Sequence, residues 1–312
     1  MGIFSGLKDF FNKKECNNEN ISDNISTVQK ALPLFTKEEL KNEFIKNGIE
    51  EHWTYFEPLI KHELRLFLKH QNTNEIGKSK IGGQPELPAN WEWPNDEKGN
   101  PLSFIGQINL EELKMFGLKD IPESGLLSFF YSGTQESWGF DPKDKDSFKL
   151  IYTSEPKGLI KYDFPNDLDE YSRFTENIIE FKQSISLPNW EDERVSAVLN
   201  EKEMDAYLNI WDHDNFIYKF LGYSNNIQGQ MELECELVTN GLYLGDASGY
   251  NDPRAKELEK NADDWTLLMQ IDSDHENTGM MWGDSGMLYF WIKTEDLKNQ
   301  NFNNGWCILQ CY

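Results

Sequence analysis

The sequence has few of the features that mark a secreted or membrane-spanning chain. Its 312 residues include four cysteines, none of them in a C-x-x-C pair, which is typical of reduced, structural thiols rather than of a disulfide framework. No apolar run approaches the roughly 18–20 residues that a helix needs to span a bilayer. No secretory signal peptide is evident at the beginning of the chain. We therefore expect a cytoplasmic protein without a transmembrane segment.

Basic residues are also scarce. The chain has 30 Lys and Arg against 54 Asp and Glu, which gives a formal net charge of −24. Because nucleic-acid binding needs a cationic face, we expect no nucleic-acid partner. The negative charge is compatible with solubility alone, and also with attraction to a basic protein partner.

Recognisable catalytic motifs are missing. The sequence has no Walker loop, Rossmann fingerprint or kinase motif, and its five histidines form no HExxH pattern. Ser285 lacks the G-x-S-x-G context of a nucleophile elbow. These absences favour a non-enzymatic binding or interaction module over an enzyme. Its partner would be an unknown small molecule or a basic protein, and no cofactor is predicted.

Aromatic residues, by contrast, are abundant. The 10 Trp, 12 Tyr and 20 Phe account for 13% of the chain, and a disordered acidic chain would lack such rings. We therefore predict a folded domain over residues 29–312. Residues 1–28 precede it as an amphipathic segment and a polar linker.

The first part of this domain, residues 29–78, carries helical signals. Thr36 and Glu39 form a capping box. The helix that they begin should end near Asn47-Gly48, where glycine accepts the left-handed conformation. Further helices are predicted over residues 53–70 and 193–210.

From residue 79 onward the pattern changes to short aromatic strands separated by Gly, Pro and Asp. The Asn240-Gly241 pair within Val238–Tyr243 is typical of a type I′ turn and predicts a hairpin there. The strongest strand predictions are Ser103–Ile108, Leu126–Tyr131, Phe148–Thr153, Thr266–Ile271, Met287–Ile292 and Trp306–Cys311.

Three pairs of similar segments occur in the same order in two parts of the chain. Chance rarely preserves order as well as residue type, so we infer two copies of one strand-rich unit. The predicted fold is α+β, with N-terminal helices packed on two repeats that are related by a pseudo-two-fold, and a mostly antiparallel sheet. The pairs are Ile81–Leu87 with Ile227–Leu233, Phe104–Asn109 with Leu267–Asp272, and Gly125–Phe130 with Gly286–Trp291. The first repeat covers residues 79–160, a connecting segment 161–218, and the second repeat 219–312.

A groove between the two repeats is the predicted ligand site. Gln107 and Gln270 each lie inside an apolar strand, where a buried amide must be hydrogen-bonded. They either tie a strand to a loop or anchor a ligand. Trp282, in a turn that contains glycine, is either an aromatic plug over the core or an exposed stacking platform. The candidate ligand-binding residues are Gln84, Gln107, Gln270, Asp272, Trp282 and Asp284.

Carboxylates also gather between residues 272 and 284. Asp272, Asp274 and Asp284 are conceivable oxygen ligands for Ca²⁺ or Mg²⁺, but their spacing lacks the glycine and terminal glutamate of an EF-hand. Solvated loop charge is the simpler interpretation, and no metal site is predicted. Two alternative functions stay open beside the binding module. One is a metal-dependent hydrolase that uses these carboxylates, and the other is an immunity-type acidic inhibitor of a basic protein.

Several motifs are specific enough to suggest a family. They are Ile81–Pro88, Trp93-Pro94, Leu102–Asn109, Leu221–Tyr223, Ile227–Gly229, Gln270–Asp274, Met280–Asp284 and Cys307–Tyr312. Together they resemble the YwqG-like family of bacterial proteins of unknown function, over roughly residues 30–312. The resemblance implies a compact α+β fold. It brings no established activity, so no catalytic residue carries over.

Overall fold

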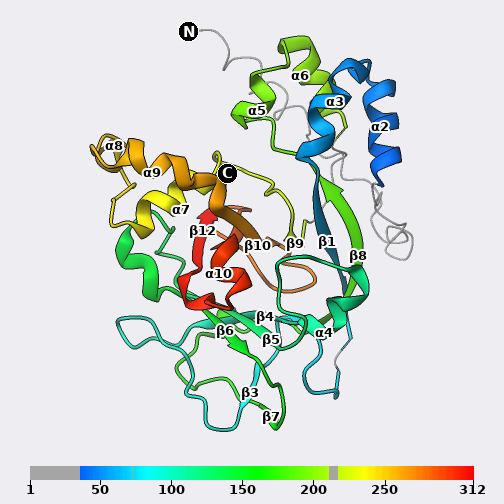
Figure 1. Ribbon diagram of the computed structural model, residues 1–312. Helices are drawn as coiled ribbons and strands as arrows, with labels where there is room; N and C mark the ends of the chain where they lie inside the picture. Colours follow the sequence, from blue (N-terminus) through cyan, green and yellow to red (C-terminus); the bar gives the residue numbers. More distant parts are fainter. Residues whose placement is uncertain (1–35, 72, 211–216) are drawn as a thin grey trace, which may run out of the picture. The chain divides into compact units, whose positions relative to one another are not determined.

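The structure, a computed structural model, describes residues 36–71, 73–210 and 217–312 (Figure 1). The described part belongs to one unit, Phe35–Tyr312. The predicted amphipathic segment and linker, residues 1–28, lie outside the described residues. None of the helices in the described part is long and apolar enough to span a bilayer.

Ten antiparallel strands form one sheet, and β3 (Glu86–Pro88) pairs separately with β7 (Leu159–Lys161). The strands of the large sheet, in spatial order, are β12 (Trp306–Gln310), β11 (Met287–Lys293), β10 (Trp265–Asp272), β9 (Lys219–Leu221), β1 (Lys61–Lys69), β8 (Asn177–Ser186), β2 (Lys80–Ile81), β4 (Ser103–Asn109), β5 (Leu126–Tyr131) and β6 (Phe148–Thr153). The predicted α+β class and antiparallel pairing are confirmed.

The large sheet curls until its two end strands, β6 and β12, approach each other. The ring of Phe148 in β6 lies 5.6 Å from that of Trp306 in β12. One strand further in, Phe129 of β5 lies 5.1 Å from Phe290 of β11. The sheet is thus nearly closed on itself, and the main hydrophobic core fills the space between its opposite parts.

Helices gather in two groups (Figure 1). The first group is α2 (Lys37–Lys46), α3 (Trp53–Phe56), α5 (Glu193–Ser196) and α6 (Glu201–Leu208), which form a second hydrophobic cluster around the end of β8. The other group is α7 (Glu232–Thr239), α8 (Ala247–Tyr250) and α9 (Ala255–Leu258), while α4 (Leu110–Leu113) follows β4 and α10 (Thr294–Lys298) follows β11. Short 3₁₀ helices are η1 (Glu50–His52), η2 (Glu57–Leu59), η3 (Lys114–Phe116), η4 (Pro142–Asp146), η5 (Glu170–Ser172), η6 (Glu259–Asp264) and η7 (Phe302–Asn304).

Local sequence signals located several element boundaries correctly. The capping box forms, because Thr36 Oγ1 accepts the Glu39 NH and the Glu39 carboxylate accepts the Thr36 NH. α2 ends before Gly48, which has a φ of +71°. All six strong strand predictions are confirmed within one residue. The predicted helix over 193–210 is divided into α5 and α6, because Asn200 caps a new helix there.

Residues 53–70 do not form the predicted helix. α3 is only four residues long, a 3₁₀ turn that contains Pro58 follows it, and residues 61–69 form β1. β1 pairs with β8 on one side and with β9 on the other, so strands far away in the sequence accept and donate its backbone hydrogen bonds. Leu64 and Leu66 are both buried, which is the two-residue period of a strand.

Residues 238–243 end a helix instead of forming the predicted hairpin. α7 precedes the Asn240-Gly241 pair, which terminates it. Gly241 has a φ of +85°, and the Leu242 NH donates to the Leu237 carbonyl at 3.1 Å. A positive φ serves a helix C-terminus as well as a type I′ turn. The Asn-Gly pair therefore predicted the position of the turn correctly. Because α7 precedes it, the turn ends a helix and does not join two strands.

The three matched segment pairs have different outcomes. In two pairs both members are strands, β4 and β10 in one and β5 and β11 in the other. The pair of Ile81–Leu87 with Ile227–Leu233 does not. Its first member runs into strand β3, whereas its second member runs into helix α7.

Two lysine side chains are buried within the sheet. Lys80 on β2 is fully buried, and its Nζ lies 2.8 Å from Glu86 Oε1 and 3.0 Å from Glu176 Oε2. Lys219 on β9 is also buried, with its Nζ 3.0 Å from Glu63 Oε2. A charge removed from water is tolerated only when it is paired and hydrogen-bonded. Both lysines meet this condition, Lys219 through Glu63 on β1, and Lys80 through Glu86 on β3 and Glu176 just before β8.

Replacing Lys80 by methionine is expected to lower the free energy of unfolding by about 3–5 kcal/mol, because the buried Glu86 carboxylate loses its cation and Glu176 keeps the longer pair with Lys161. Urea unfolding followed by tryptophan fluorescence measures this change. Lys98→Met is the matched control, since Lys98 pairs with Glu136 on the surface and such pairs contribute about 0–1 kcal/mol. Equal effects of the two substitutions would contradict the role assigned to the buried lysine.

Candidate functional site

Gln107 and Gln270, the two glutamines predicted inside apolar strands, are both buried. Gln107 Nε2 donates to the Lys78 carbonyl at 2.8 Å, and its Oε1 accepts the Glu86 NH at 3.3 Å. The amide of Gln107 is therefore spent in tying β4 to the segment that contains β2 and β3. This is the structural role that the sequence offered as an alternative to ligand binding.

Gln270 makes the same kind of contacts in the second half of the sheet. Its Nε2 donates to the Ile217 carbonyl at 3.2 Å, and its Oε1 accepts the Asn225 NH at 2.9 Å. Asp272 lies close by and accepts the Ile217 NH at 2.9 Å. Gln270 and Asp272 thus bind Ile217, which precedes β9, and Gln270 also binds Asn225 in the turn after β9.

The remaining candidates lie apart from this pair. Trp282 is fully buried, with its ring 6.0 Å from Tyr131 and 5.5 Å from Phe174, so it is a plug in the core and offers no stacking surface. Gln84 donates to Asp163 at 2.8 Å, and Asp284 is exposed. The structure therefore brings Gln270 and Asp272 together but does not gather the six residues around one opening, and their contact with a ligand stays a prediction.

Within the carboxylate-rich loop over residues 272–284, Asp274 bonds to the loop itself. Asp274 accepts the Asn277 NH at 3.1 Å and the Asn277 side-chain amide at 2.9 and 3.0 Å. In the part of the chain that the structure describes, Asp272, Asp274 and Asp284 do not gather as a set of ligands around one point.

A cavity of about 350 Å³ opens beside the seam where β6 and β12 approach each other. We call it the seam cavity. It lies among η4, the end of α7, the ends of β10 and β11, α10 and η7. Its lining includes Lys145, Trp265, Lys293, Asp296, Asn303 and Trp306. The sequence analysis did not identify these residues, although the amide-rich run over residues 299–305 was a usable signal.

The polar groups of the seam cavity differ in their availability. Trp265 Nε1 donates to the buried Glu236 carboxylate at 2.9 Å, and Lys293 Nζ lies 2.6 Å from the same carboxylate. The Trp265 NH and the Lys293 ammonium therefore already have a partner within the protein. Lys145 and Asn303, in contrast, make no side-chain hydrogen bond or ion pair with any residue that the structure describes.

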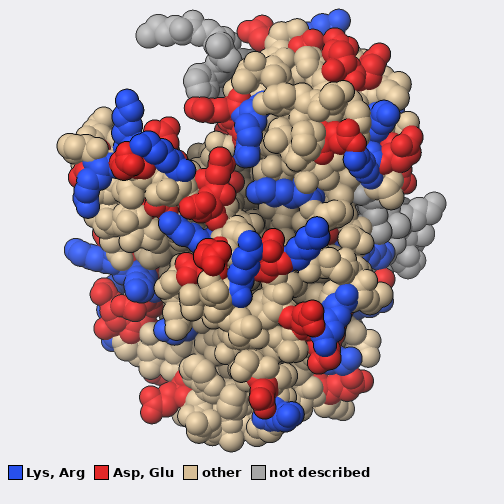
Figure 2. All heavy atoms as spheres, viewed as in Figure 1, with Lys and Arg blue, Asp and Glu red and all other residues tan. Residues whose placement is uncertain are grey.

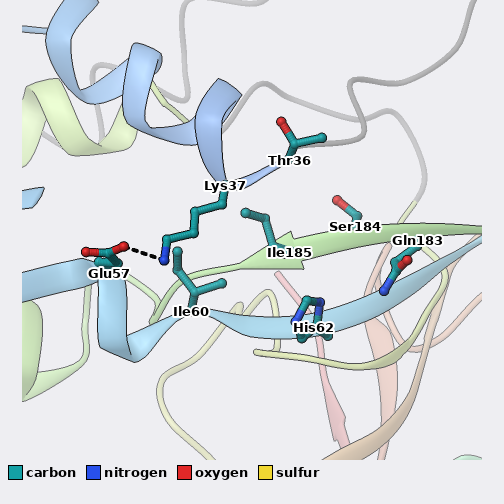
Figure 3. A pocket seen from close by; sticks show the side chains of 8 residues that line it. All are labelled: Thr36, Lys37, Glu57, Ile60, His62, Gln183, Ser184 and Ile185. Atoms are coloured by element: carbon teal, nitrogen blue, oxygen red, sulfur yellow. Dashed lines mark ion pairs between the residues drawn. The ribbon is translucent and has the colours of Figure 1, made fainter. Parts of the chain in front are cut away.

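A second cavity, of about 420 Å³, lies between the start of α2 and the strands β1 and β8 (Figure 3). We call it the helix–strand cavity. An ion pair between Lys37 and Glu57 borders it, and Ile60 and Ile185 form its apolar part. Its other lining groups are Thr36, His62, Gln183 and Ser184.

Asp272 has an unusual titration for a candidate site residue. Burial raises the pKa of its carboxyl to about 6, although the Ile217 NH that it accepts acts in the opposite direction. Between about pH 4 and pH 6 the folded state therefore holds more protons than the unfolded state, whose carboxyl titrates near 3.9. The contribution of this group to stability falls as the pH rises through that range and stays low above it.

Asp272→Asn is expected to raise the free energy of unfolding at pH 7 by about 1–3 kcal/mol, because asparagine keeps the acceptor for the Ile217 NH without the buried charge. The gain should disappear at pH 4. Urea unfolding at both pH values tests this, with the exposed Asp284→Asn as the control. A gain of the same size at both pH values, or none at pH 7, would refute the assignment.

The chain matches a family model but no curated protein. The model describes a domain of unknown function, DUF1963, and it matches residues 79–311. The seam cavity is lined entirely from this range, whereas most of the helix–strand cavity lies before it. Because the match covers more than half of the 312 residues, the chain belongs to the DUF1963 family.

Proposed function

We propose that this protein is a non-enzymatic binding module whose seam cavity takes a small organic anion with an apolar part. The observation that carries the proposal is that two exposed donors, the Lys145 ammonium and the Asn303 amide, have no partner among the described residues and line one cavity with the edges of Trp265 and Trp306. A cavity of about 350 Å³ lies at the lower end of the range for small-molecule sites. A carboxylate would pair with Lys145 while its hydrocarbon part displaced water from the apolar wall.

The lining favours binding over catalysis. Among the described residues, it contains no serine, cysteine or histidine, which nucleophilic catalysis and general-base catalysis most often use. The one carboxylate of this described lining, Asp296, accepts the Asn304 amide at 2.8 Å and the Asn301 amide at 3.2 Å. The Thr239 hydroxyl donates to the Cys235 carbonyl at 2.6 Å. Neither group is placed as a base or nucleophile.

We also propose that the large sheet consists of two related halves. Its order is β12-β11-β10-β9-β1 followed by β8-β2-β4-β5-β6, so each half has a counterpart for every strand. β4 and β10 each have a register irregularity against the next strand. Gln107 and Gln270 each bond one backbone carbonyl and one backbone NH of the neighbouring segment. These parallels support a pseudo-two-fold between β1 and β8.

The buried lysines extend this correspondence and change the alignment of the first segment. Lys80 precedes Gly82-Gly83 and Lys219 precedes Leu221-Gly222, and all four of these following residues have a positive φ. Gly83 lies against Glu176, and Gly222 lies against Glu63, so closely that an added Cβ would come within 2.8 and 2.7 Å of the glutamate Cβ atoms. Residues 80–83 therefore correspond to 219–222 in the proposal, rather than 81–87 to 227–233.

The proposal also includes a subfamily, a location and an alternative partner. Membership of the YwqG-like group rests on the motifs of the sequence, and a place in the bacterial cytoplasm rests on that resemblance. A basic protein partner rests on the net charge of −24. Figure 2 shows acidic and basic side chains interleaved on the displayed face, so that face has no broad patch of one sign. The small-molecule proposal therefore has the more specific support.

Lys145→Ala is expected to weaken the binding of benzoate at least about tenfold, because a hydrogen bond to a charged group contributes about 1.5–3 kcal/mol. Benzoate is the probe because it combines a carboxylate with a ring, and benzyl alcohol is the uncharged comparison. Ligand-observed NMR on the full chain measures both affinities. Lys143→Ala is the matched control, since Lys143 lies on the same 3₁₀ helix η4 outside the cavity lining.

Succinate and inorganic phosphate serve as further probes in the same experiment. Binding of any anionic probe that Lys145→Ala weakens and Lys143→Ala does not supports the proposed site. Equal affinities for benzoate and benzyl alcohol, or no binding of any probe, would contradict it. Chemical conversion of a bound probe by the protein would favour an enzyme instead.

A further inference from the structure

Three metal-ligating side chains from distant parts of the sequence converge in the first helical group. Glu51 and His52 lie on η1, and Glu203 lies in the first turn of α6. One ligand atom of each lies within 4.8 Å of the others. His52 Nε2 lies 3.4 Å from Glu203 Oε1. The set is separate from the seam cavity and from the carboxylate loop over residues 272–284.

The framework around this set is rigid. His52 directly precedes Trp53, and Glu203 lies one helical turn before Tyr207. The ring of Phe44 lies 5.4 Å from Trp53 and 6.3 Å from Tyr207, and all three side chains are buried. The elements that carry the ligands are thus fixed against each other by one hydrophobic cluster. The backbones that carry the ligands are thus held in place, while the exposed Glu51 side chain is left for an ion to order.

His52 Nε2 is buried and makes no hydrogen bond within the described part of the chain. The 3.4 Å separation from Glu203 Oε1 is longer than the usual range of an N–H···O hydrogen bond. Leaving such a nitrogen unsatisfied is unfavourable, and a native structure normally satisfies it with a partner, a water or an ion.

Glu203 offers one oxygen to this nitrogen. Its Oε2 accepts the Asn200 NH at 2.9 Å in the capping box of α6. Its Oε1 is directed toward His52. The capping bond therefore holds the Glu203 carboxylate in the orientation that a shared ligand would need.

We propose that Glu51, His52 and Glu203 bind one divalent transition-metal ion of the Zn²⁺ type. Imidazole nitrogen is a common ligand of Zn²⁺, Cu²⁺ and Ni²⁺, while Mg²⁺ and Ca²⁺ select oxygen ligands only. Bonds of about 2.0–2.2 Å from Zn²⁺ to nitrogen and oxygen fit the 3.4 Å between His52 Nε2 and Glu203 Oε1. The exposed Glu51 side chain can turn toward this pair from within 4.8 Å. The ion gives the orphaned His52 nitrogen a partner and links η1 to α6.

The proposal predicts binding of one Zn²⁺ per chain, measured by isothermal titration calorimetry on the full chain. Glu203→Gln is the sharpest variant, because glutamine at this position still accepts the Asn200 NH while the carboxylate ligand is lost. The affinity for Zn²⁺ should fall at least about tenfold, since even loss of an outer-sphere partner costs 10–100-fold. Glu51→Gln and His52→Ala should lower it in the same way.

Two control variants distinguish this site from Zn²⁺ binding elsewhere on the chain. His70→Ala removes an exposed histidine and should leave the affinity unchanged, as should Asp274→Asn in the carboxylate loop. Zn²⁺ should also raise the unfolding temperature of the wild type by mass action but not that of Glu203→Gln. Absence of Zn²⁺ binding, or binding that only Asp274→Asn abolishes, would overturn the proposal and leave His52 and Glu203 as a simple ion pair.

Discussion

Two ammonium groups buried in the middle of the sheet are the constraint on which the rest of the fold depends. Lys80 and Lys219 can remain inside only with carboxylates beside them, and these come from the beginning of β3 and the residue before β8 for Lys80 and from β1 for Lys219. Each ion pair therefore fixes the turn after its lysine, Gly82-Gly83 or Leu221-Gly222, against the central strands β1 and β8. Because β1 and β8 pair with each other along the whole of β1, both halves of the sheet are anchored to one ribbon.

Both proposed sites lie away from the central pair β1 and β8, one at the unpaired edges of the sheet and one beyond the end of β8. The curled sheet brings β6 and β12 together through aromatic contacts such as Phe148 with Trp306, without pairing them by backbone hydrogen bonds. η4 and η7 border the seam, and the seam cavity lies beside them, where Lys145 and Asn303 have no partner among the described residues. At the other place, the end of β8 supports the first helical group. Its aromatic cluster holds Glu51, His52 and Glu203 within reach of one ion.

The sequence predicted what local patterns determine. The Thr36 capping box and six aromatic strands were recognised because a cap and a two-residue period depend on neighbours in the chain. β1 was mistaken for a helix, since only its distant partners β8 and β9 decide its conformation.

Gln107 and Gln270 stood out as amides in apolar strands, and their contacts explain why they are there. Lys80 and Lys219 were overlooked, because they lie in strands of two and three residues that show no periodicity of their own. His52 and Glu203, and Lys145 and Asn303, meet only after folding, so no spacing rule could have joined them.

Native-state amide hydrogen exchange tests most directly whether the two buried networks organise both halves alike. The backbone NH groups of Glu86 and Asn225 donate to the buried Gln107 and Gln270 side chains, beside Lys80 and Lys219 respectively. Both amides should exchange only through global unfolding, with the same free energy as the slowest amides of β1 and β8. Exchange of either amide through a local opening of much lower free energy would contradict the account. It would mean that the buried lysine does not stabilise the half of the sheet to which that amide belongs.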